Sequence, residues 1–244
     1  MTRGLSLYLD ILRFGAALVV LVTHLAYTEL SGGMLGYWRL LGNDAVMIFF
    51  ALSGFVIAYA AEEKEHTLGT YARSRLARLW SVAVPALALT IALDHWGSQL
   101  DPAAYAQWWY QASDPVWRSV RALSFTNEVW FSGVRPFSNG PWWSLGYEAF
   151  YYAIFAALFY IPGWKGRAAA GALMVIAGPP ILLLAPIWWL GVRTWRRVKH
   201  GPLPADKSAL LFFGSIATYA LYRWSGLPLL LKGLTALAIG PDNV

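Results

Sequence analysis

The chain has 244 residues, of which 58% are apolar and only 13% are charged, against about 25% charged in typical soluble domains. This composition excludes a soluble fold with a charged surface and predicts one integral membrane protein. The absence of cysteine excludes disulfide scaffolds, thiolate metal sites and cysteine nucleophiles. The net charge of +6 does not indicate nucleic-acid binding, because the basic residues lie between apolar runs.

The first apolar run, residues 7–27, has the length of about 20 residues that a membrane-crossing helix needs. It contains three ionisable side chains, Asp10, Arg13 and His24. Arg13 follows Asp10 by one turn, and eleven further residues at about 100° each bring His24 to within roughly 20° of the face of Arg13. The three side chains are therefore predicted to form one polar stripe, with Arg13 and His24 about 16 Å apart along the axis.

Later apolar runs predict an all-α bundle of about eight membrane segments. Within one of these runs, Gly178-Pro179-Pro180 removes backbone donors and the proline rings clash with the preceding turn, so we predict two helices in a hairpin there. With the N-terminus in the cytoplasm, cytoplasmic loops hold twelve basic residues and outer segments hold five, as the positive-inside rule requires. The runs are 46–61, 79–93, 144–161, 168–190, 209–224 and 227–239.

The long polar region, residues 94–143, is predicted to lie outside the membrane and contains seven of the fourteen tryptophans. We predict interfacial helices there, with tryptophan at the depth of the headgroups. Tryptophan rings that stack on sugars are the alternative. The sequence shows no internal repeat, so residues 1–244 are predicted to form a single transmembrane domain.

Polar residues of the later spans are candidates for a functional site. An unpaired carboxylate inside a span is costly, so Glu148 needs a partner: His24, an acceptor hydroxyl or a purely structural ion pair. Ser144 is a possible N-cap of the same helix, and Ser53-Gly54 is predicted to be a close contact between helices. No metal site is predicted, because the other histidines lack partners at metal-ligand spacing. They are His66, His95 and His200.

Four motifs, in this order, resemble the acyltransferase-3 family of bacterial integral-membrane acyltransferases. The first is Leu9-Asp10-Ile11-Leu12-Arg13 with His24, and the second is Gly42-Asn43-Asp44 leading into the stretch 49–55 around Ser53. The third is Arg73-Ser74-Arg75-Leu76-Ala77-Arg78, and the fourth is Trp143-Ser144-Leu145 with Glu148 and Tyr152. Together they cover roughly residues 9–152 of the chain.

The resemblance implies a multi-pass enzyme of the bacterial inner membrane. It would move an acyl group, most simply acetyl, from cytoplasmic acyl-CoA to a hydroxyl of an extracytoplasmic carbohydrate or glycolipid, with no permanently bound cofactor. It implies catalytic roles for His24, Arg13 and Glu148, and donor binding by Arg73, Arg75 and Arg78. Those arginines could instead anchor the helix at anionic headgroups. Supporting roles are implied for Asp10, Asp44, Ser53, Trp143, Ser144 and Tyr152.

Two alternatives to this enzyme remain. A transporter could use the buried residues Asp10, Arg13, His24 and Glu148 to relay protons or to bind a solute, and the Gly178-Pro179-Pro180 break is typical of such proteins. An inactive, C-terminally short family member is the other alternative, because the family usually continues to about ten spans. A sequence departure also lies in the first motif, where Phe14 stands in place of the expected glycine.

Overall fold

The structure is a computed structural model that describes residues 2–27, 31–107, 109–201, 203–227 and 230. In these ranges the secondary structure is helical, apart from one isolated bridge between Gln111 and Phe137. The all-α prediction is therefore confirmed. The chain forms two compact units, Met1–Arg196 and Arg197–Val244.

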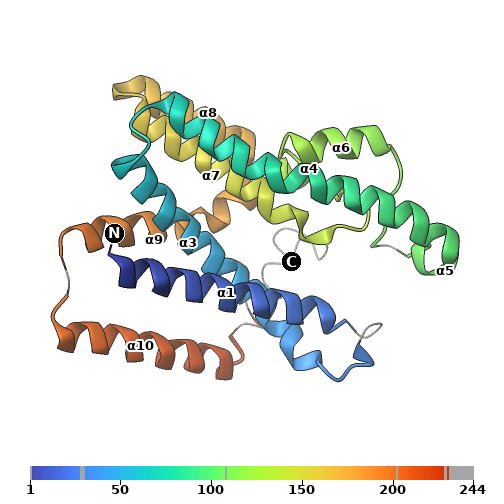
Figure 1. Ribbon diagram of the computed structural model, residues 1–244, viewed down its shortest axis with the longest axis horizontal. Coiled ribbons are helices and arrows are strands. Elements are labelled where there is room, and N and C mark those ends of the chain that lie inside the picture. Colours follow the sequence, from blue (N-terminus) through green and yellow to red (C-terminus); the bar gives the residue numbers. More distant parts are fainter. Residues whose placement is uncertain (1, 28–30, 108, 202, 228–229, 231–244) are drawn as a thin grey trace. The chain divides into compact units, whose positions relative to one another are not determined.

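Two helices of the first unit, α1 (Arg3–Leu25) and α3 (Gly42–Glu63), lie side by side (Figure 1). The 3-10 helix η1 (Gly36–Leu41) leads directly into α3. The hydroxyl of Thr2 caps α1 by accepting a hydrogen bond from the backbone N–H of Leu5. At the other end of α1, Thr23 donates to the carbonyl of Trp38 at 3.1 Å. These contacts fix the helix that carries the predicted Asp10/Arg13/His24 stripe.

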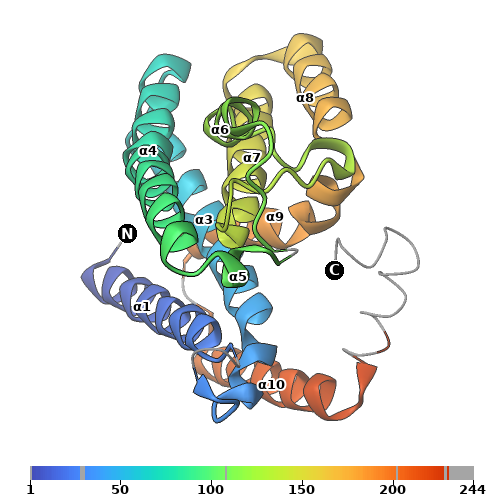
Figure 2. The same cartoon turned by 90° about the vertical axis from the view of Figure 1, so that its right-hand side faces the viewer.

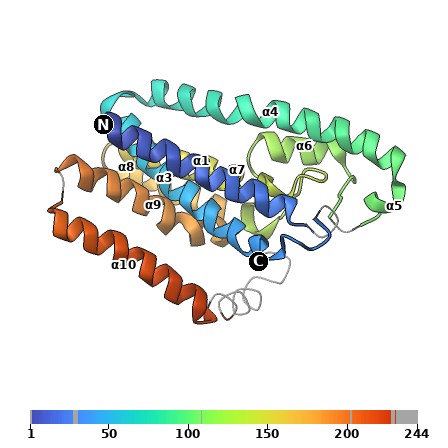
Figure 3. The same ribbon diagram turned by 60° about the horizontal axis from the view of Figure 1, so that its bottom comes forward.

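The long helix α4 (Leu68–Leu100) begins with a capping box, in which Thr67 and Thr70 each bond the other's backbone. It extends well beyond the predicted span 79–93 at both ends. At its start it includes the three arginines of the third motif, and at its end it enters the region predicted to be outside the membrane. Figure 3 shows α4 as one continuous helix with α6 (Pro115–Leu123) beside its C-terminal half.

The segment between α4 and α7 is a folded structure with few regular elements: α5 (Pro102–Tyr105), α6, η2 (Val129–Phe131) and η3 (Gly140–Trp142). Asp94 of α4 is buried and accepts a hydrogen bond from the backbone N–H of Ser138 at 2.9 Å. Arg118 donates to the side chain of Gln111 at 2.7 Å and to the carbonyl of Arg135 at 2.9 Å. These side chains fix the loops where regular hydrogen bonding is sparse.

Three helices follow: α7 (Trp143–Tyr160), α8 (Gly163–Ala177) and α9 (Pro179–Lys199). Figure 2 shows α7 and α8, which pack together. The predicted break in the run 168–190 is confirmed. Gly178 has φ of 80°, a left-handed conformation that glycine adopts without steric strain. The two prolines that follow occupy the first turn of α9, where their missing N–H groups leave no hydrogen bond unmade.

The core of the first unit lies where α3, α7 and α9 meet, and it is rich in aromatic side chains. Trp188 and Phe155 are each 1% exposed, with ring centroids 5.8 Å apart. A Cβ atom on Gly54 would lie under 3.0 Å from the carbonyl oxygen of Trp188, and one on Gly191 equally close to that of Ala51. The predicted close contact at Ser53-Gly54 is therefore confirmed, with α9 as the partner helix.

Within the described ranges, three helices are long and apolar enough to cross a membrane: α1, α3 and α4. Large apolar side chains are exposed along one face of α1, including Leu7 at 61%, Phe14 at 72% and Leu21 at 55%. A continuous exposed apolar face is unfavourable in water, so this face of α1 is consistent with contact with lipid. In the second unit the run 209–224 forms most of α10 (Ala205–Trp224). The run 227–239 lies almost entirely outside the described residues.

Candidate active site

His24 is half-buried near the end of α1. Its Nδ1 lies 2.7 Å from the carbonyl oxygen of Val20, one turn earlier. A carbonyl only accepts hydrogen bonds, so Nδ1 carries the ring proton, and Nε2 of the neutral imidazole has a free lone pair. In the described part of the chain Nε2 has no hydrogen-bond partner. The geometry therefore leaves His24 able to accept a proton from a bound molecule.

The polar stripe of α1 also contains a side-chain pair one turn apart. Nη1 of Arg13 lies 3.5 Å from Oδ1 of Asp10, and the two side chains are 33% and 63% exposed. The continuous helix keeps His24 on the same stripe. Among the described residues, however, no hydrogen bond or ion pair joins His24 or Arg13 to Glu148. The structure therefore separates two polar groups, one on α1 and one in the core.

The core group is centred on Glu148 of α7. Its Oε1 accepts a hydrogen bond from the Ser53 hydroxyl at 2.7 Å and another from the hydroxyl of Tyr152, one turn along α7. The indole N–H of Trp188 donates to the oxygen of Ser53 at 3.3 Å. Hydroxyl donors stabilise a carboxylate where water is largely excluded. The partners of Glu148 in the described structure are thus hydroxyls, rather than His24 or an ion-pair cation.

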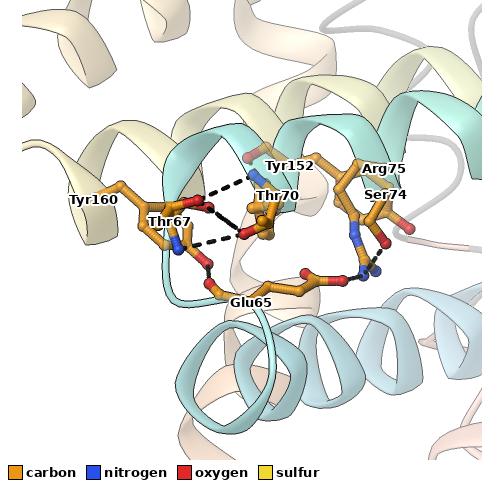
Figure 4. Close-up of polar contacts among 8 residues, drawn as sticks. Glu65, Thr67, Thr70, Ser74, Arg75, Tyr152 and Tyr160 are labelled. Carbon is orange, nitrogen blue, oxygen red and sulfur yellow. Dashed lines mark hydrogen bonds and ion pairs between the residues drawn. The ribbon is translucent and has the colours of Figure 1, made fainter.

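The three arginines of the third motif lie within α4, and their environments differ. Arg75 is buried, whereas Arg73 and Arg78 are exposed. Nη2 of Arg75 lies 2.5 Å from Oε1 of Glu65, and Figure 4 shows the two side chains pointing toward each other. The guanidinium also lies over the ring of Tyr152, 5.9 Å from its centroid. The guanidinium of Arg75 is therefore held by contacts within the protein, whereas the side chains of Arg73 and Arg78 are open to a ligand.

Sequence reasoning did not find two residues of these groups, Glu65 and Trp188. Glu65 stands in the charged stretch 62–65, which looks like a solvated loop, and Trp188 stands inside an apolar run. The hydroxyl of Tyr160 at the end of α7 donates to the carbonyl of Glu65. Glu65 could have been found as a carboxylate just before a helix that carries three arginines, since such a carboxylate can pair with one of them.

The remaining predicted site residues have local roles in the structure. Ser144 is not an N-cap, because η3 leads directly into α7; its hydroxyl donates to the carbonyl of Pro141 at 3.2 Å. Trp143 packs edge-on against Tyr147, with ring centroids 5.1 Å apart. Asp44 lies in the first turn of α3, where the helix dipole favours a negative charge.

Two other features of the described structure do not provide catalytic groups. No group of three or more His, Asp or Glu side chains that could hold a metal ion is present in the described ranges. A groove of about 650 Å³ lies between α4 and α6, lined by apolar side chains such as Trp80 and Val120 and by two serines. Without a titratable group, this groove offers no acid or base. The candidate site is therefore built from α1, α3, α7 and the start of α4.

Lipid-facing helices and buried polar groups together define a helical membrane protein with a histidine and a carboxylate in separate polar groups. The family model of an acyltransferase domain, acyltransferase-3, matches residues 6–240. The chain belongs to this family, which confirms the resemblance drawn from its motifs. No match is found among curated proteins or among solved structures.

Proposed function

We propose that this membrane acyltransferase is an O-acyltransferase, which moves an acyl group, most simply acetyl, from cytoplasmic acyl-CoA to a hydroxyl of an extracytoplasmic carbohydrate or glycolipid. The observation that carries the proposal is the hydrogen bond between Nδ1 of His24 and the carbonyl of Val20. It leaves Nε2 as the lone-pair nitrogen of an imidazole, the side chain that most often serves as a general base in proton transfer.

In the proposed reaction, Nε2 of His24 removes the proton of the acceptor hydroxyl while the hydroxyl oxygen attacks the thioester carbonyl. A new C–O bond forms, and the carbonyl oxygen takes up negative charge. Arg13 lies about 16 Å from His24 along the helix axis, so its guanidinium, paired with Asp10, would bind a phosphate of the donor instead of this oxygen. The C–S bond then breaks, and the leaving thiolate takes the proton from His24. The products are the acylated acceptor and free CoA.

Glu148 fits a role in binding the acceptor. Both hydroxyl donors bind its Oε1, so Oε2 is available to accept a further hydrogen bond from a substrate hydroxyl. Ser53 on α3 and Tyr152 on α7 would then hold the carboxylate of Glu148 in place. These hydrogen bonds explain how Ser53 of the second motif and Tyr152 of the fourth motif could act as supporting residues.

For the donor, we propose that Arg73 and Arg78 bind the phosphates of CoA, and that Arg75 positions the start of α4 through Glu65. The exposed guanidinium groups of Arg73 and Arg78 can each offer paired N–H donors to a phosphate. The proposal places the N-terminus and these arginines on the cytoplasmic side of a bacterial inner membrane, with about eight membrane segments in all.

Donor binding is tested by the melting temperature of the purified protein in detergent. A ligand at about 100 times its dissociation constant stabilises the folded state by about 2.7 kcal/mol. We expect CoA to raise the melting temperature, with adenosine as the control ligand. The rise should shrink in Arg78→Lys, which keeps the charge but loses the paired donors.

Arg167→Lys, at an exposed arginine outside the motif, is the matched control variant and should keep the full shift. A folded protein whose melting temperature does not respond to millimolar CoA would contradict the donor assignment.

A further inference from the structure

A second buried polar cluster lies outside the groups described above, in the segment that leads into α7. Asn127 is fully buried, and its Nδ2 donates to Oε1 of Glu128 at 3.0 Å. The carbonyl of Asn127 accepts from the hydroxyl of Ser132 at 2.9 Å, and that hydroxyl accepts from Arg121 at 2.6 Å. The cluster joins α6 to η2 and sets the direction of the Glu128 side chain.

The cluster lies against the beginning of α7, in the helix that carries Glu148. A Cβ atom on Gly146 would be 3.0 Å from Oδ1 of Asn127, so the amide packs tightly against this glycine. The Tyr147 hydroxyl group lies within electrostatic reach of Glu128. Glu128 therefore lies near the first turns of the helix that carries Glu148.

Two polar atoms of this cluster are buried and have no hydrogen-bond partner in the described structure: Oδ1 of Asn127 and Nε of Arg121. Native proteins leave few buried polar atoms unsatisfied, and such atoms often mark functional sites. Glu128 itself is half-buried, and its carboxylate makes no hydrogen bond in the described ranges other than the one from Asn127. The cluster is an incomplete polar network with an open carboxylate oxygen.

The backbone around the cluster is strained. Among the described residues, every non-glycine residue with positive φ lies between positions 114 and 137, and their φ values run from 50° to 62°. Such conformations cost about 1–3 kcal/mol each and persist where the surrounding structure enforces them, commonly at binding sites. They are Asp114, Phe125, Trp130, Phe131 and Phe137.

Burial raises the pKa of Glu128 to about 7, although the hydrogen bond from Asn127 and the charges of Arg135 and Arg121 oppose this shift. The groups that face the carboxyl are thus Asn127, the two arginines and Tyr147. Below pH 7 the carboxyl is mainly protonated, and above pH 7 it is mainly a carboxylate. A carboxylate accepts a hydrogen bond from a hydroxyl about twice as strongly as a neutral group does.

We propose that Glu128, oriented by Asn127, is a hydroxyl-binding residue of an acceptor subsite at the beginning of α7, and that its ligand is a carbohydrate. The inference rests on the proposed function for the identity of the acceptor. The chemistry fits a polyhydroxylated ring: a carboxylate that accepts from a hydroxyl, two guanidinium groups whose charges reach it, and, two residues further along the chain, the exposed indole ring of Trp130, which offers a flat apolar face. When a binding site is shaped for a substrate hydroxyl, loss of the hydrogen bond to that hydroxyl weakens substrate binding.

The test is saturation-transfer NMR on the purified protein in detergent at pH 8. The probe is a mixture of the methyl α-glycosides of glucose, galactose, mannose and N-acetylglucosamine. We expect at least one glycoside to receive saturation from the protein, and its affinity to fall about tenfold in Glu128→Gln, which keeps the shape but loses the charge. Between pH 8 and pH 6 the affinity of the unmodified protein should fall, whereas that of the variant should stay constant.

Asp114→Asn is the matched control, because it removes one negative charge from the same segment at an exposed side chain without a capping hydrogen bond. Asparagine also tolerates the positive φ at this position. Glycoside binding should be unchanged in this variant. Equal binding by the unmodified protein and Glu128→Gln, or no saturation of any glycoside, would overturn the inference.

The CoA-dependent rise in melting temperature separates this inference from the proposed function. A CoA response without glycoside binding would reject the subsite and leave the donor assignment intact. Glycoside binding that depends on Glu128, in a protein that does not respond to CoA, would support the subsite and contradict the proposed donor.

Discussion

Replacement of His24 by alanine is expected to lower acyl transfer by about 100-fold to 10,000-fold, the range by which positioned general bases accelerate reactions. The physical reason is the hydrogen bond from Nδ1 to the carbonyl of Val20, which directs the lone pair of Nε2 away from the helix backbone. The measurement is the turnover of labelled acetyl-CoA with a carbohydrate acceptor.

The control for this variant is His95→Ala, because His95 is exposed on α4 and, in the described structure, its ring hydrogen-bonds only the side chain of Gln99. It should keep normal turnover. His24→Ala should also keep the melting temperature of the unmodified protein within a few degrees, since the imidazole is only half-buried. Turnover near normal in a folded His24→Ala protein would return His24 to a packing role and contradict the mechanism.

Gly54→Ala is expected to have the largest effect on stability. A methyl group at this position would lie under 3.0 Å from the backbone carbonyl of Trp188, and backbone atoms of a packed helix cannot move aside as a flexible side chain can. Overpacking of this kind costs about 1–3 kcal/mol, occasionally more. Moving α9 away would also separate the indole N–H of Trp188 from Ser53, and so disturb the Glu148 group.

The measurement is the melting temperature in detergent, with Gly171→Ala as the matched control. Gly171 is also a helical glycine, and a Cβ there would meet nothing within 4 Å, so alanine should stabilise α8 by up to about 1 kcal/mol. Gly191→Ala should behave like Gly54→Ala, because it meets the carbonyl of Ala51 from the other side of the same crossing. Equal melting temperatures for Gly54→Ala and Gly171→Ala would contradict the described packing.

Local features of the fold could be predicted from the sequence because they depend on nearby residues. The spacing of Asp10 and Arg13 alone places them one turn apart, and their side chains do approach to 3.5 Å. The conformational limits of Gly178-Pro179-Pro180 were enough to divide α8 from α9. By contrast, the N-cap prediction for Ser144 was wrong, since a preceding 3-10 turn supplies the start of α7.

The partners of Glu148 and Arg75 could not be predicted, because they depend on how distant segments pack. Ser53 and Glu148 are 95 residues apart in the chain, and no periodicity relates a residue on α3 to one on α7. Glu65 precedes Arg75 by ten residues, but its burial depends on the turn between α3 and α4. The sequence could identify costly polar residues inside apolar helices, and only the fold assigns their partners.

The central claim is transfer of an acyl group from CoA on one side of a membrane to a carbohydrate on the other. Its most direct test uses the protein in sealed liposomes, oriented by selective proteolysis of exposed loops, with labelled acetyl-CoA on the side of Arg73 and Arg78 and an oligosaccharide panel on the opposite side. We predict label on an oligosaccharide hydroxyl, with one free CoA formed for each acetyl group transferred. Release of CoA without labelled oligosaccharide, or no reaction in either orientation, would contradict the proposed function.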